Sequence, residues 1–561
     1  MTSARRLARL CLGGLAFAGF VAHPASIGGT ASASGAERVL LVGLGDSITH
    51  GTMNATNNYV NAGNAYLQRV ADQLATVVPV RFSLPFYAFG EIRKKPFALP
   101  TNLGVDGSDS FSIEGLDYYK RLGATSPPSA VSPALLCDRP FLRPSDDDYD
   151  KVLYPINLLA HQPVSQVDAA VWTLTEGARL QRLHKALVVL WIGNNDSSLA
   201  ALGGGGANPQ FQPFPFDQIK NELKPALRYL LRYAEKTGQV SFAPYTQAAI
   251  ERNLTDLADF AAQYDHLLGR LTTETAGSSA DIQWLVLTLP YYSAVGYLMD
   301  SEDIEFYLRK YIPTYTVPAS FKRVAPQGQP ITDPLQGDRV SLLTFGFMVT
   351  LAGTGHGVAE INAILDDNGV QRDGIVLSED EQKFIMNRID GFNTAIKTVA
   401  AGYGPQVHVV DMGRFLNDAL TGKTPVFAGD RQLTRKWTRG SSFSFDGVHP
   451  SYTAQSLIAN QLLQHVNGVL GVSAPSYDLG QVIATDPYAD QDGDGWAPGP
   501  DYPADGGITQ LLSLLRDPDD ADPTEQVQMP ADVWDQISAV LLHQLLGIHS
   551  VAEEARRMGI H

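Results

Sequence analysis

Two short stretches of the sequence carry residues suited to acyl-transfer chemistry. Residues 40–51, LLVGLGDSITHG, are an apolar run followed by a polar turn that presents Ser47. Residues 444–455, SFDGVHPSYTAQ, place Asp446 three residues before His449. On a turn, this spacing lets the carboxylate hold one imidazole nitrogen while the other nitrogen faces a serine hydroxyl. The pattern predicts a catalytic triad of Ser47, His449 and Asp446.

Attack of a serine on an ester carbonyl creates an oxyanion, which needs hydrogen-bond donors. Residues 190–198, LWIGNNDSS, end a predicted strand and supply Asn195, whose side-chain amide can donate. Residues 101–111, TNLGVDGSDSF, supply Gly107, whose backbone N–H can approach closely because glycine has no Cβ. The backbone N–H of Gly104, in the same stretch, is an alternative donor to the oxyanion.

Two other readings of the turn after residue 43 fail on the residue that carries the chemistry. A dinucleotide-binding fingerprint needs a third glycine where this chain has Ile48. A phosphate-binding P-loop needs a lysine after its last glycine, but Gly51 is followed by Thr52 and Met53. The histidines are scattered, without the His-Glu-x-x-His spacing, so a catalytic metal has no support.

Short apolar runs along the chain predict the buried strands that position these stretches. We predict strands at Val39–Gly43, Val78–Ser83, Leu187–Ile192, Trp284–Leu289 and Val407–Val410. Helical patterns lie between them, and strand alternating with helix predicts a parallel sheet covered by helices on both faces. Unusually long spacings place insertions near 108–180, 203–245 and 295–375.

Four blocks, in order along the chain, resemble those of the SGNH (GDSL) hydrolase superfamily. They are Gly45-Asp46-Ser47, Gly107, Gly193-x-Asn195-Asp196 and Asp446-x-x-His449. The segments WIGNND and VLSEDEQKFIMNRIDGFNTAIK look like the secreted lipase and acylhydrolase branch of that family. The resemblance extends over roughly residues 38 to 468.

The resemblance implies a three-layer α/β/α fold with a flavodoxin-like sheet of five parallel strands, and an active site at their carboxyl ends. It implies that Ser47 is the nucleophile, that His449 acts as base and then acid, and that Asp446 orients the imidazole. The implied oxyanion hole consists of the Ser47 N–H, the Gly107 N–H and the Asn195 side chain. We prefer Gly107 to Gly104 because VDGSDS better matches the small-residue turn of the family.

Composition and the N-terminal residues bear on the location of the protein. The 561 residues carry a formal net charge of −17, which argues against nucleic acids and anionic membranes as partners. Residues 1–33 have arginines, then an apolar run, then small residues, which is the layout of a secretory signal peptide. We therefore expect a secreted or periplasmic protein with no transmembrane segment after signal removal. Its remaining cysteine, Cys137, is expected to be structural.

The chain changes in composition after the hydrolase-like region, for which we predict the bounds 34–471. Residues 472–530 are rich in Asp, Gly and Pro and read as a linker. Within them, DQDGDGWAPGPD resembles a calcium loop, with a solvated acidic turn as the alternative. Its predicted ligands are the carboxylates of Asp490, Asp492, Asp494 and Asp501 and the backbone carbonyl oxygen of Trp496. Residues 531–561 have the apolar stripe of an amphipathic helix.

The favoured function is a lipase or carboxylesterase that acts on small-molecule or lipid esters without a cofactor, apart from structural Ca²⁺. One alternative is a carbohydrate O-acetylesterase, and another is a non-catalytic, calcium-dependent surface-binding protein on a hydrolase scaffold. The apolar segment 340–353 is either a lid or acyl groove, or a buried structural segment.

Overall fold

The computed structural model describes residues 38–503, apart from 145, 203–246, 354 and 367–375. Three predicted segments therefore lie outside the described residues: the signal peptide, the helix at 531–561 and the insertion at 203–245.

A central sheet of five parallel strands organises the molecule, with the strand order β10-β6-β5-β1-β2. The strands are β1 (Val39–Gly45), β2 (Val80–Arg81), β5 (Lys185–Trp191), β6 (Asp281–Leu287) and β10 (Val407–Val410). The first strand in the chain lies inside the sheet and the second at its edge, which is the flavodoxin-like order. The predicted three-layer α/β/α fold with five parallel strands is confirmed.

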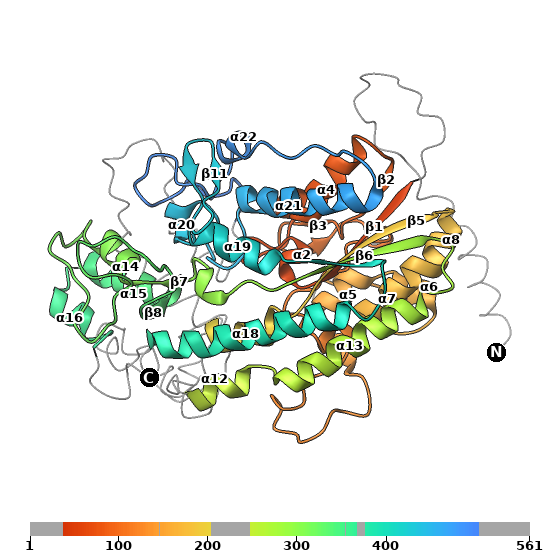
Figure 1. Ribbon diagram of the computed structural model, residues 1–561, viewed down its shortest axis with the longest axis horizontal. Helices are drawn as coiled ribbons and strands as arrows, with labels where there is room; N and C mark the ends of the chain where they lie inside the picture. Colours follow the sequence, from red (N-terminus) through yellow and green to blue (C-terminus); the bar gives the residue numbers. More distant parts are fainter. Residues whose placement is uncertain (1–37, 145, 203–246, 354, 367–375, 504–561) are drawn as a thin grey trace, which may run out of the picture.

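Helices cover both faces of this sheet, which explains why the inner strand β1 is apolar throughout. All seven residues of β1 are buried, as expected for a strand between two helix layers. One layer contains α4 (Tyr66–Ala75), α19 (Met412–Leu420) and α21 (Tyr452–Leu470), and the other contains α7 (Gln166–Trp172), α13 (Leu257–Glu274) and α18 (Glu379–Ala400) (Figure 1).

Only β10 has its predicted bounds, and the other four strands differ from theirs. Strand β1 runs on to Gly45, and β5 spans Lys185–Trp191 instead of Leu187–Ile192. Strand β2 keeps only Val80–Arg81 of the predicted 78–83. As an edge strand, β2 pairs with β1 alone. Both of its residues are half-buried, and only these two residues pair with β1. Strand β6 begins at Asp281, three residues before the predicted start, because polar residues at its exposed end still pair with β5.

The segment 108–180 is not only an insertion, because its second half completes the helix layer under the sheet. It contains η1 (Ser112–Glu114), η2 (Pro133–Leu135), α5 (Asp148–Leu153), α6 (Ile156–Ala160), α7, η3 (Thr173–Gly177) and α8 (Ala178–Gln181). Helix α7 packs against both β1 and α13. Its N-terminus is fixed by a capping box between Ser165 and Asp168.

The segment 295–375 forms a substructure at one end of the molecule (left in Figure 1). Its described elements are β7 (Leu298–Met299), α14 (Ser301–Leu308), β8 (Arg339–Ser341), α15 (Leu342–Gly353) and α16 (Val358–Asn362), and β9 (Val376–Leu377) completes its antiparallel sheet. Within 340–353, Phe345 is fully buried and its ring contacts those of Tyr307 and Trp437. Of the two predicted alternatives, the structure therefore supports the buried structural segment and not the lid or acyl groove.

Short elements join and complete these layers. The described helices among them are α2 (Ser47–His50), α3 (Tyr59–Asn64), α9 (Asn195–Leu202), α12 (Gln247–Asn253), η4 (Tyr292–Ala294), α20 (Trp437–Gly440) and α22 (Leu479–Ile483). The two hairpins pair β3 (Tyr87–Ala88) with β4 (Ile92–Arg93), and β11 (Phe427–Ala428) with β12 (Arg431–Gln432).

Residues 472–503 pack against the body of the protein, in contrast to the linker predicted after 471. Trp496 is fully buried, and its ring contacts those of Tyr307 and Trp437. The Tyr502 hydroxyl donates to the Asn61 side chain over 3.1 Å. Aromatic side chains therefore fix a segment whose Asp, Gly and Pro content suggested a linker.

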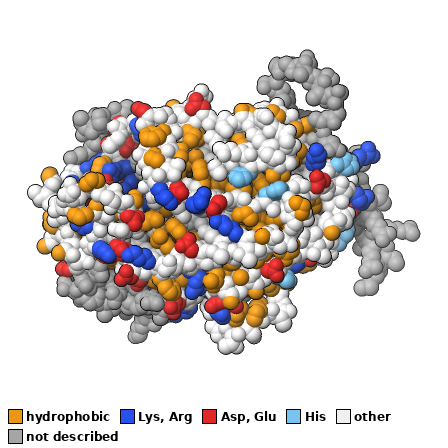
Figure 2. Space-filling model, in the orientation of Figure 1, with side chains coloured by type: hydrophobic (Ala, Val, Ile, Leu, Met, Phe, Trp, Pro, Cys, Tyr) orange, Lys and Arg blue, Asp and Glu red, His pale blue; other side chains and the backbone are white. Residues whose placement is uncertain are grey.

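The surface seen in Figure 2 carries acidic and basic side chains interspersed, with hydrophobic atoms between them. This face therefore shows no large patch of one charge sign. Within the described part of the chain, none of the helices has the length and apolarity needed to cross a bilayer.

Candidate active site

The turn that presents Ser47 follows directly from the end of β1. A Cβ on Gly45, whose φ is +156°, would lie 2.3 Å from the Trp191 carbonyl oxygen, so only glycine fits there. Asp46 caps helix α2 by accepting the Ile48 N–H over 3.0 Å. Ser47 is therefore the first residue of a short helix, and its side chain stands at the carboxyl end of the sheet.

The structure brings the three predicted triad residues together. The His449 Nε2 lies 2.9 Å from the Ser47 Oγ, and the His449 Nδ1 lies 2.8 Å from the Asp446 Oδ2. These residues are up to 402 positions apart in the sequence. The geometry allows Nε2 to take the serine proton while Asp446 holds the other ring nitrogen protonated.

Backbone N–H groups surround the Asp446 carboxylate and fix its position. Asp446 Oδ1 accepts from Val448 and His449 over 2.8 Å each, and Oδ2 accepts from Ala55 over 2.7 Å. Burial alone would raise the pKa of this carboxyl. The charge of His449 and these hydrogen bonds outweigh burial and lower the pKa, so Asp446 stays ionised.

The electrostatics of His449 mirror those of its partner. Burial lowers the pKa of the imidazole, but the attraction and hydrogen bond of Asp446 outweigh it and raise the pKa above the ordinary histidine value. Only 14% of the His449 side chain is exposed. This combination favours a ring that accepts the Ser47 proton readily when the histidine starts out neutral.

Gly107 is better placed than Gly104 for the oxyanion hole. A Cβ on Gly104 would lie 2.6 Å from the His50 backbone nitrogen, so this glycine allows the chain to pass close behind α2. Gly107 is exposed, has a φ of +72° and has open space around it. Among the described residues, neither the Ser47 nor the Gly107 backbone N–H donates to a protein group. Both N–H groups remain available to a substrate oxygen.

Asn195 lies beside the Gly107 loop. Its Nδ2 donates to the Ser108 carbonyl oxygen over 2.8 Å, and its Oδ1 accepts from the Ser198 hydroxyl over 2.9 Å. An amide nitrogen has two hydrogens, so the second N–H of Asn195 can serve a developing oxyanion. The predicted donors from three segments are thus on adjoining loops.

Gln166 joins two of these loops, and no sequence pattern predicts this role. This fully buried side chain accepts the Gly45 N–H over 3.3 Å and donates to the Ser108 Oγ over 2.6 Å. It therefore connects the end of β1 to the loop that carries Gly107. The partners are 121 and 58 residues away in the sequence, and no local pattern marks such a contact.

Two aspartates beside the site hold its loops. Asp46 accepts a hydrogen bond from the Asn194 side chain over 2.9 Å, and burial raises its pKa to about 6. Asp196 accepts from both the backbone and the hydroxyl of Ser110, over 2.8 and 2.7 Å. Burial, together with Asp109, raises the pKa of Asp196 to about 7.

A second His–Asp pair lies next to the triad. The His50 Nδ1 is 2.8 Å from the Asp106 Oδ1, and Asp106 also accepts from Thr52 and Asn57. Burial disfavours the charged form of each side chain. The attraction and hydrogen bond between Asp106 and His50 have a larger effect than burial, so the pKa of Asp106 falls to about 2 and that of His50 rises. Within the described residues, the buried His50 Nε2 has no hydrogen-bond partner.

The predicted calcium loop brings three of its carboxylates together. Asp490, Asp492 and Asp494 each have a carboxylate oxygen within 4.8 Å of the others. Asp501 is exposed and does not belong to this cluster. The side chain of Trp496 is buried in the core, and the ligand role of its backbone carbonyl oxygen stays a prediction. The Lys310 ammonium lies 3.1 Å from the Asp494 Oδ2 and offsets part of the negative charge.

Comparisons with known proteins leave the site to be interpreted from its own geometry. A scan against protein-family models and searches among curated proteins and solved structures found no match to this chain.

Proposed function

We propose that this protein is a secreted serine hydrolase that cleaves carboxylic esters of the lipase or carboxylesterase type. The observation that carries the proposal is the continuous hydrogen-bond chain from the Ser47 Oγ through the His449 imidazole to the Asp446 carboxylate, at 2.9 and 2.8 Å. This arrangement also supports the resemblance to the SGNH hydrolases. The signal-like residues 1–33 support secretion.

In the proposed reaction, the Ser47 Oγ attacks the ester carbonyl carbon as His449 Nε2 takes its proton. The carbonyl oxygen becomes an oxyanion and accepts hydrogen bonds from the Ser47 N–H, the Gly107 N–H and the Asn195 amide. Protonated His449 then gives its proton to the departing alcohol oxygen, which leaves an acyl group on the serine. Water, deprotonated by His449 Nε2, attacks the carbonyl carbon of this ester. The bond to the Ser47 Oγ then breaks, His449 returns the proton to that oxygen, and the carboxylic acid is released.

The two alternative functions make different demands on the site. A non-catalytic surface-binding protein has no need of an aligned triad, so the intact proton path favours the enzymatic proposal. A carbohydrate O-acetylesterase needs the same triad but room only for an acetyl group. Activity on p-nitrophenyl esters with C2 to C16 acyl chains distinguishes this alternative from a lipase or carboxylesterase.

The test of the main proposal is the Ser47→Ala variant with p-nitrophenyl butyrate as the substrate. We expect a folded protein without measurable hydrolysis, because the nucleophile is gone and the cap of α2 is supplied by Asp46. Ser279→Ala is the matched control. Ser279 is exposed and precedes β6, so it lies at the amino ends of the parallel strands, opposite the carboxyl ends where Ser47 lies. Turnover by Ser47→Ala close to that of wild type would falsify the proposal.

We also propose a structural Ca²⁺ at Asp490, Asp492 and Asp494, since carboxylate oxygens are the ligands that this ion prefers. Calorimetry of the full-length protein should show heat on adding Ca²⁺ and a higher Tm. The Asp492→Asn variant should lose both effects, and equal behaviour of variant and wild type would reject the site.

A further inference from the structure

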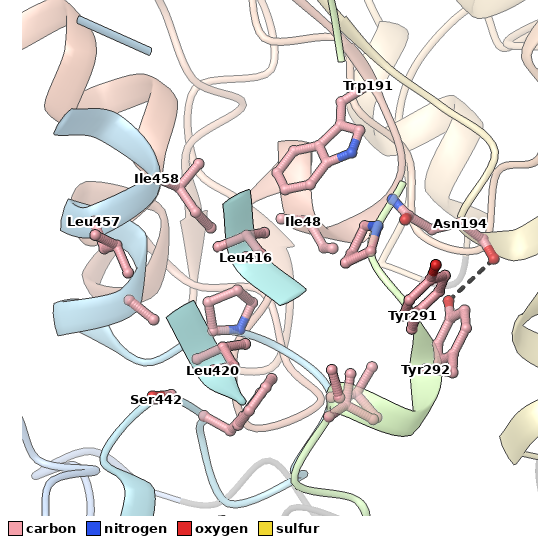
Figure 3. A pocket seen from close by; sticks show the side chains of 17 residues that line it. Ile48, Trp191, Asn194, Tyr291, Tyr292, Leu416, Leu420, Ser442, Leu457 and Ile458 are labelled. Carbon is pink, nitrogen blue, oxygen red and sulfur yellow. Dashed lines mark hydrogen bonds between the residues drawn. The ribbon is translucent and has the colours of Figure 1, made fainter. Parts of the chain in front are cut away.

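The three donors of the proposed oxyanion hole come from three separate segments, so their spacing depends on how these segments are joined. The Ser47 turn is joined to the start of α9 by the Asn194 side chain, which donates to Asp46 over 2.9 Å. The Tyr292 hydroxyl also holds the start of α9, because it donates to the Asn194 backbone carbonyl oxygen over 3.1 Å (Figure 3). The Ser47 N–H and the Asn195 amide are therefore fixed relative to each other.

The loop that carries Gly107 is joined to both of the other segments at Ser108. The Asn195 side chain donates to the Ser108 carbonyl oxygen over 2.8 Å, and Gln166 donates to the Ser108 hydroxyl over 2.6 Å. The Gln166 Oε1 in turn accepts the N–H of Gly45, two residues before the nucleophile, over 3.3 Å. Ser108 and Gln166 are both fully buried. A single buried glutamine therefore connects the Ser47 turn to the loop that carries Gly107.

Gly107 depends on the residues on either side of it for its orientation. It is exposed, has a φ of +72° and has open space around the position of a Cβ. Before it in the chain, the Val105 N–H and the Asp106 carboxylate make hydrogen bonds to the end of β1 and to α2. After it, Ser108 is held by Gln166. The direction of the Gly107 N–H is therefore set by an anchor on each side.

The direction of each hydrogen bond around Gln166 is also fixed. An amide nitrogen does not accept hydrogen bonds, so the Gly45 N–H turns the Gln166 oxygen toward itself and leaves the amide nitrogen for Ser108. The Ser108 hydroxyl lies 2.9 Å from that of Tyr149, which donates to the Ser112 carbonyl oxygen over 3.4 Å. Burial raises the pKa of Tyr149 to about 12, so its hydroxyl stays protonated. The position of Gln166 thus requires one acceptor and one donor on the same side chain.

We propose that Gln166 is a positioning residue of the esterase. Acting through Ser108, it sets the spacing between the three donors of the oxyanion hole. This inference rests on the proposed function. Gln166 is buried away from the ester, so it contributes to the stabilisation of the developing oxyanion and not to the binding of the substrate. A misplacement of about 1 Å at a reacting site can lower the rate by about 10²-fold, so a residue that only holds a loop can have a large effect on kcat.

Gln166→Leu removes both hydrogen bonds while keeping a side chain of similar volume. With p-nitrophenyl butyrate, we expect kcat to fall by about 10²-fold and KM to stay within about threefold. Gln382→Leu is the matched control, since Gln382 is also buried and donates to the Gly337 carbonyl oxygen over 2.8 Å, where α18 meets the segment 295–375. This control should have a lower Tm and an unchanged kcat. A folded Gln166→Leu protein with the wild-type kcat, or with a change in KM alone, would overturn the positioning role.

Ser108→Ala tests the route by which Gln166 acts. It removes one hydroxyl and leaves the backbone bond to Asn195, so it also serves where Gln166→Leu does not fold. Its kcat should fall by a similar factor, again with little change in KM. Since both substitutions break the same connection, the double variant should be no slower than the slower single variant. Losses that multiply in the double variant would show two independent effects and reject the route through Ser108.

The affinity for a boronic acid tests the oxyanion hole directly. Such a compound adds to the Ser47 Oγ, and an oxygen of its tetrahedral anion occupies the hole as in the transition state. The Ki of butylboronic acid should rise in Gln166→Leu by about the same factor as kcat falls, about 10²-fold. An unchanged Ki, in a protein whose hydrolysis depends on Ser47, would reject the positioning role and leave the esterase intact. A wild-type protein without Ser47-dependent hydrolysis would reject the esterase, and this inference with it.

Discussion

This protein has two histidine–aspartate pairs, one that contacts Ser47 and one that includes His50, three residues after Ser47, and their electrostatics are nearly the same. His449 with Asp446 and His50 with Asp106 each have an Nδ1–carboxylate distance of 2.8 Å. In both pairs the histidine pKa is raised and the aspartate pKa is lowered. A charged pair of this kind is therefore not in itself a mark of catalysis.

The difference lies at the second ring nitrogen. The His449 Nε2 meets the Ser47 Oγ, and 14% of the side chain is exposed. The His50 Nε2 is buried without a hydrogen-bond partner among the described residues, and the ring lies 5.4 Å from that of Tyr87. In the proposed mechanism, the His449 imidazole moves a proton to and from the substrate, whereas the His50 imidazole only holds a charge. Access to a nucleophile is therefore what distinguishes the proposed catalytic pair from the second pair.

We expect the largest difference between the two pairs when each histidine is replaced by asparagine and kcat/KM is measured. His449→Asn removes the general base and should lower kcat/KM for p-nitrophenyl butyrate by about 10⁴-fold, the upper end of such effects. His50→Asn should lower it by less than about tenfold, because that ring contacts no reacting group in the proposed mechanism. Circular dichroism checks that both variants fold. Similar losses in the two variants would break the distinction.

Substitution of the two aspartates should separate the pairs by pH. Asp446→Asn should lower kcat/KM by about 10²–10³-fold. The residual activity should persist to lower pH. Activity requires neutral His449 and falls as pH drops through its raised pKa, and loss of Asp446 lowers that pKa.

The control for this pH experiment is Asp106→Asn. Asp106 also raises the His449 pKa, but less than Asp446 does, so the acid limb should move in the same direction by a smaller amount. The two pH–rate profiles are compared with that of wild type. A larger movement with Asp106→Asn than with Asp446→Asn would show that the pairs have been assigned the wrong roles.

The sequence predicted the pair of Asp446 and His449 but not the pair of His50 and Asp106. Asp446 and His449 are three residues apart on one turn, and Ser47 follows an apolar strand, so local patterns revealed the triad and the sheet. His50 and Asp106 are 56 residues apart, and Gln166 contacts Gly45 across 121 residues. Such contacts depend on how the loops pack together, and neither spacing nor residue type marks them.

Composition was also a weaker guide than packing after residue 471. The Asp, Gly and Pro content predicted a linker, yet Tyr488 and Trp496 are fully buried. The Asp486 carboxylate accepts from both the backbone and the hydroxyl of Thr453 on α21, over 2.7 Å each. A few large side chains and one buried carboxylate are enough to fix this segment, and an average over its residues conceals them.

The second pair should show its role in stability. His50→Asn leaves Asp106 without its charged partner and should lower the free energy of unfolding by about 2 kcal/mol. The raised His50 pKa means that its stabilisation is fully present below the ordinary value of about 6.5 and is lost as pH rises through the folded-state pKa. The difference in Tm between wild type and variant should therefore be larger at low than at high pH. A difference that grows as pH rises would contradict the structural charge pair.

The smallest expected effect concerns a backbone feature that only the catalytic pair has. Ala55 donates its N–H to Asp446 from a left-handed conformation, with a φ of +52°. This conformation costs a non-glycine residue about 1 kcal/mol, so Ala55→Gly should raise the Tm slightly. Activity should stay within about twofold, because glycine offers the same N–H to the carboxylate. His161→Gly, at a similar φ of +58° outside the site, is the control and should likewise raise the Tm. A fall in activity with Ala55→Gly alone would mean that the strained backbone itself positions Asp446, and the catalytic pair would then differ from the structural one in its support as well as in its access to Ser47.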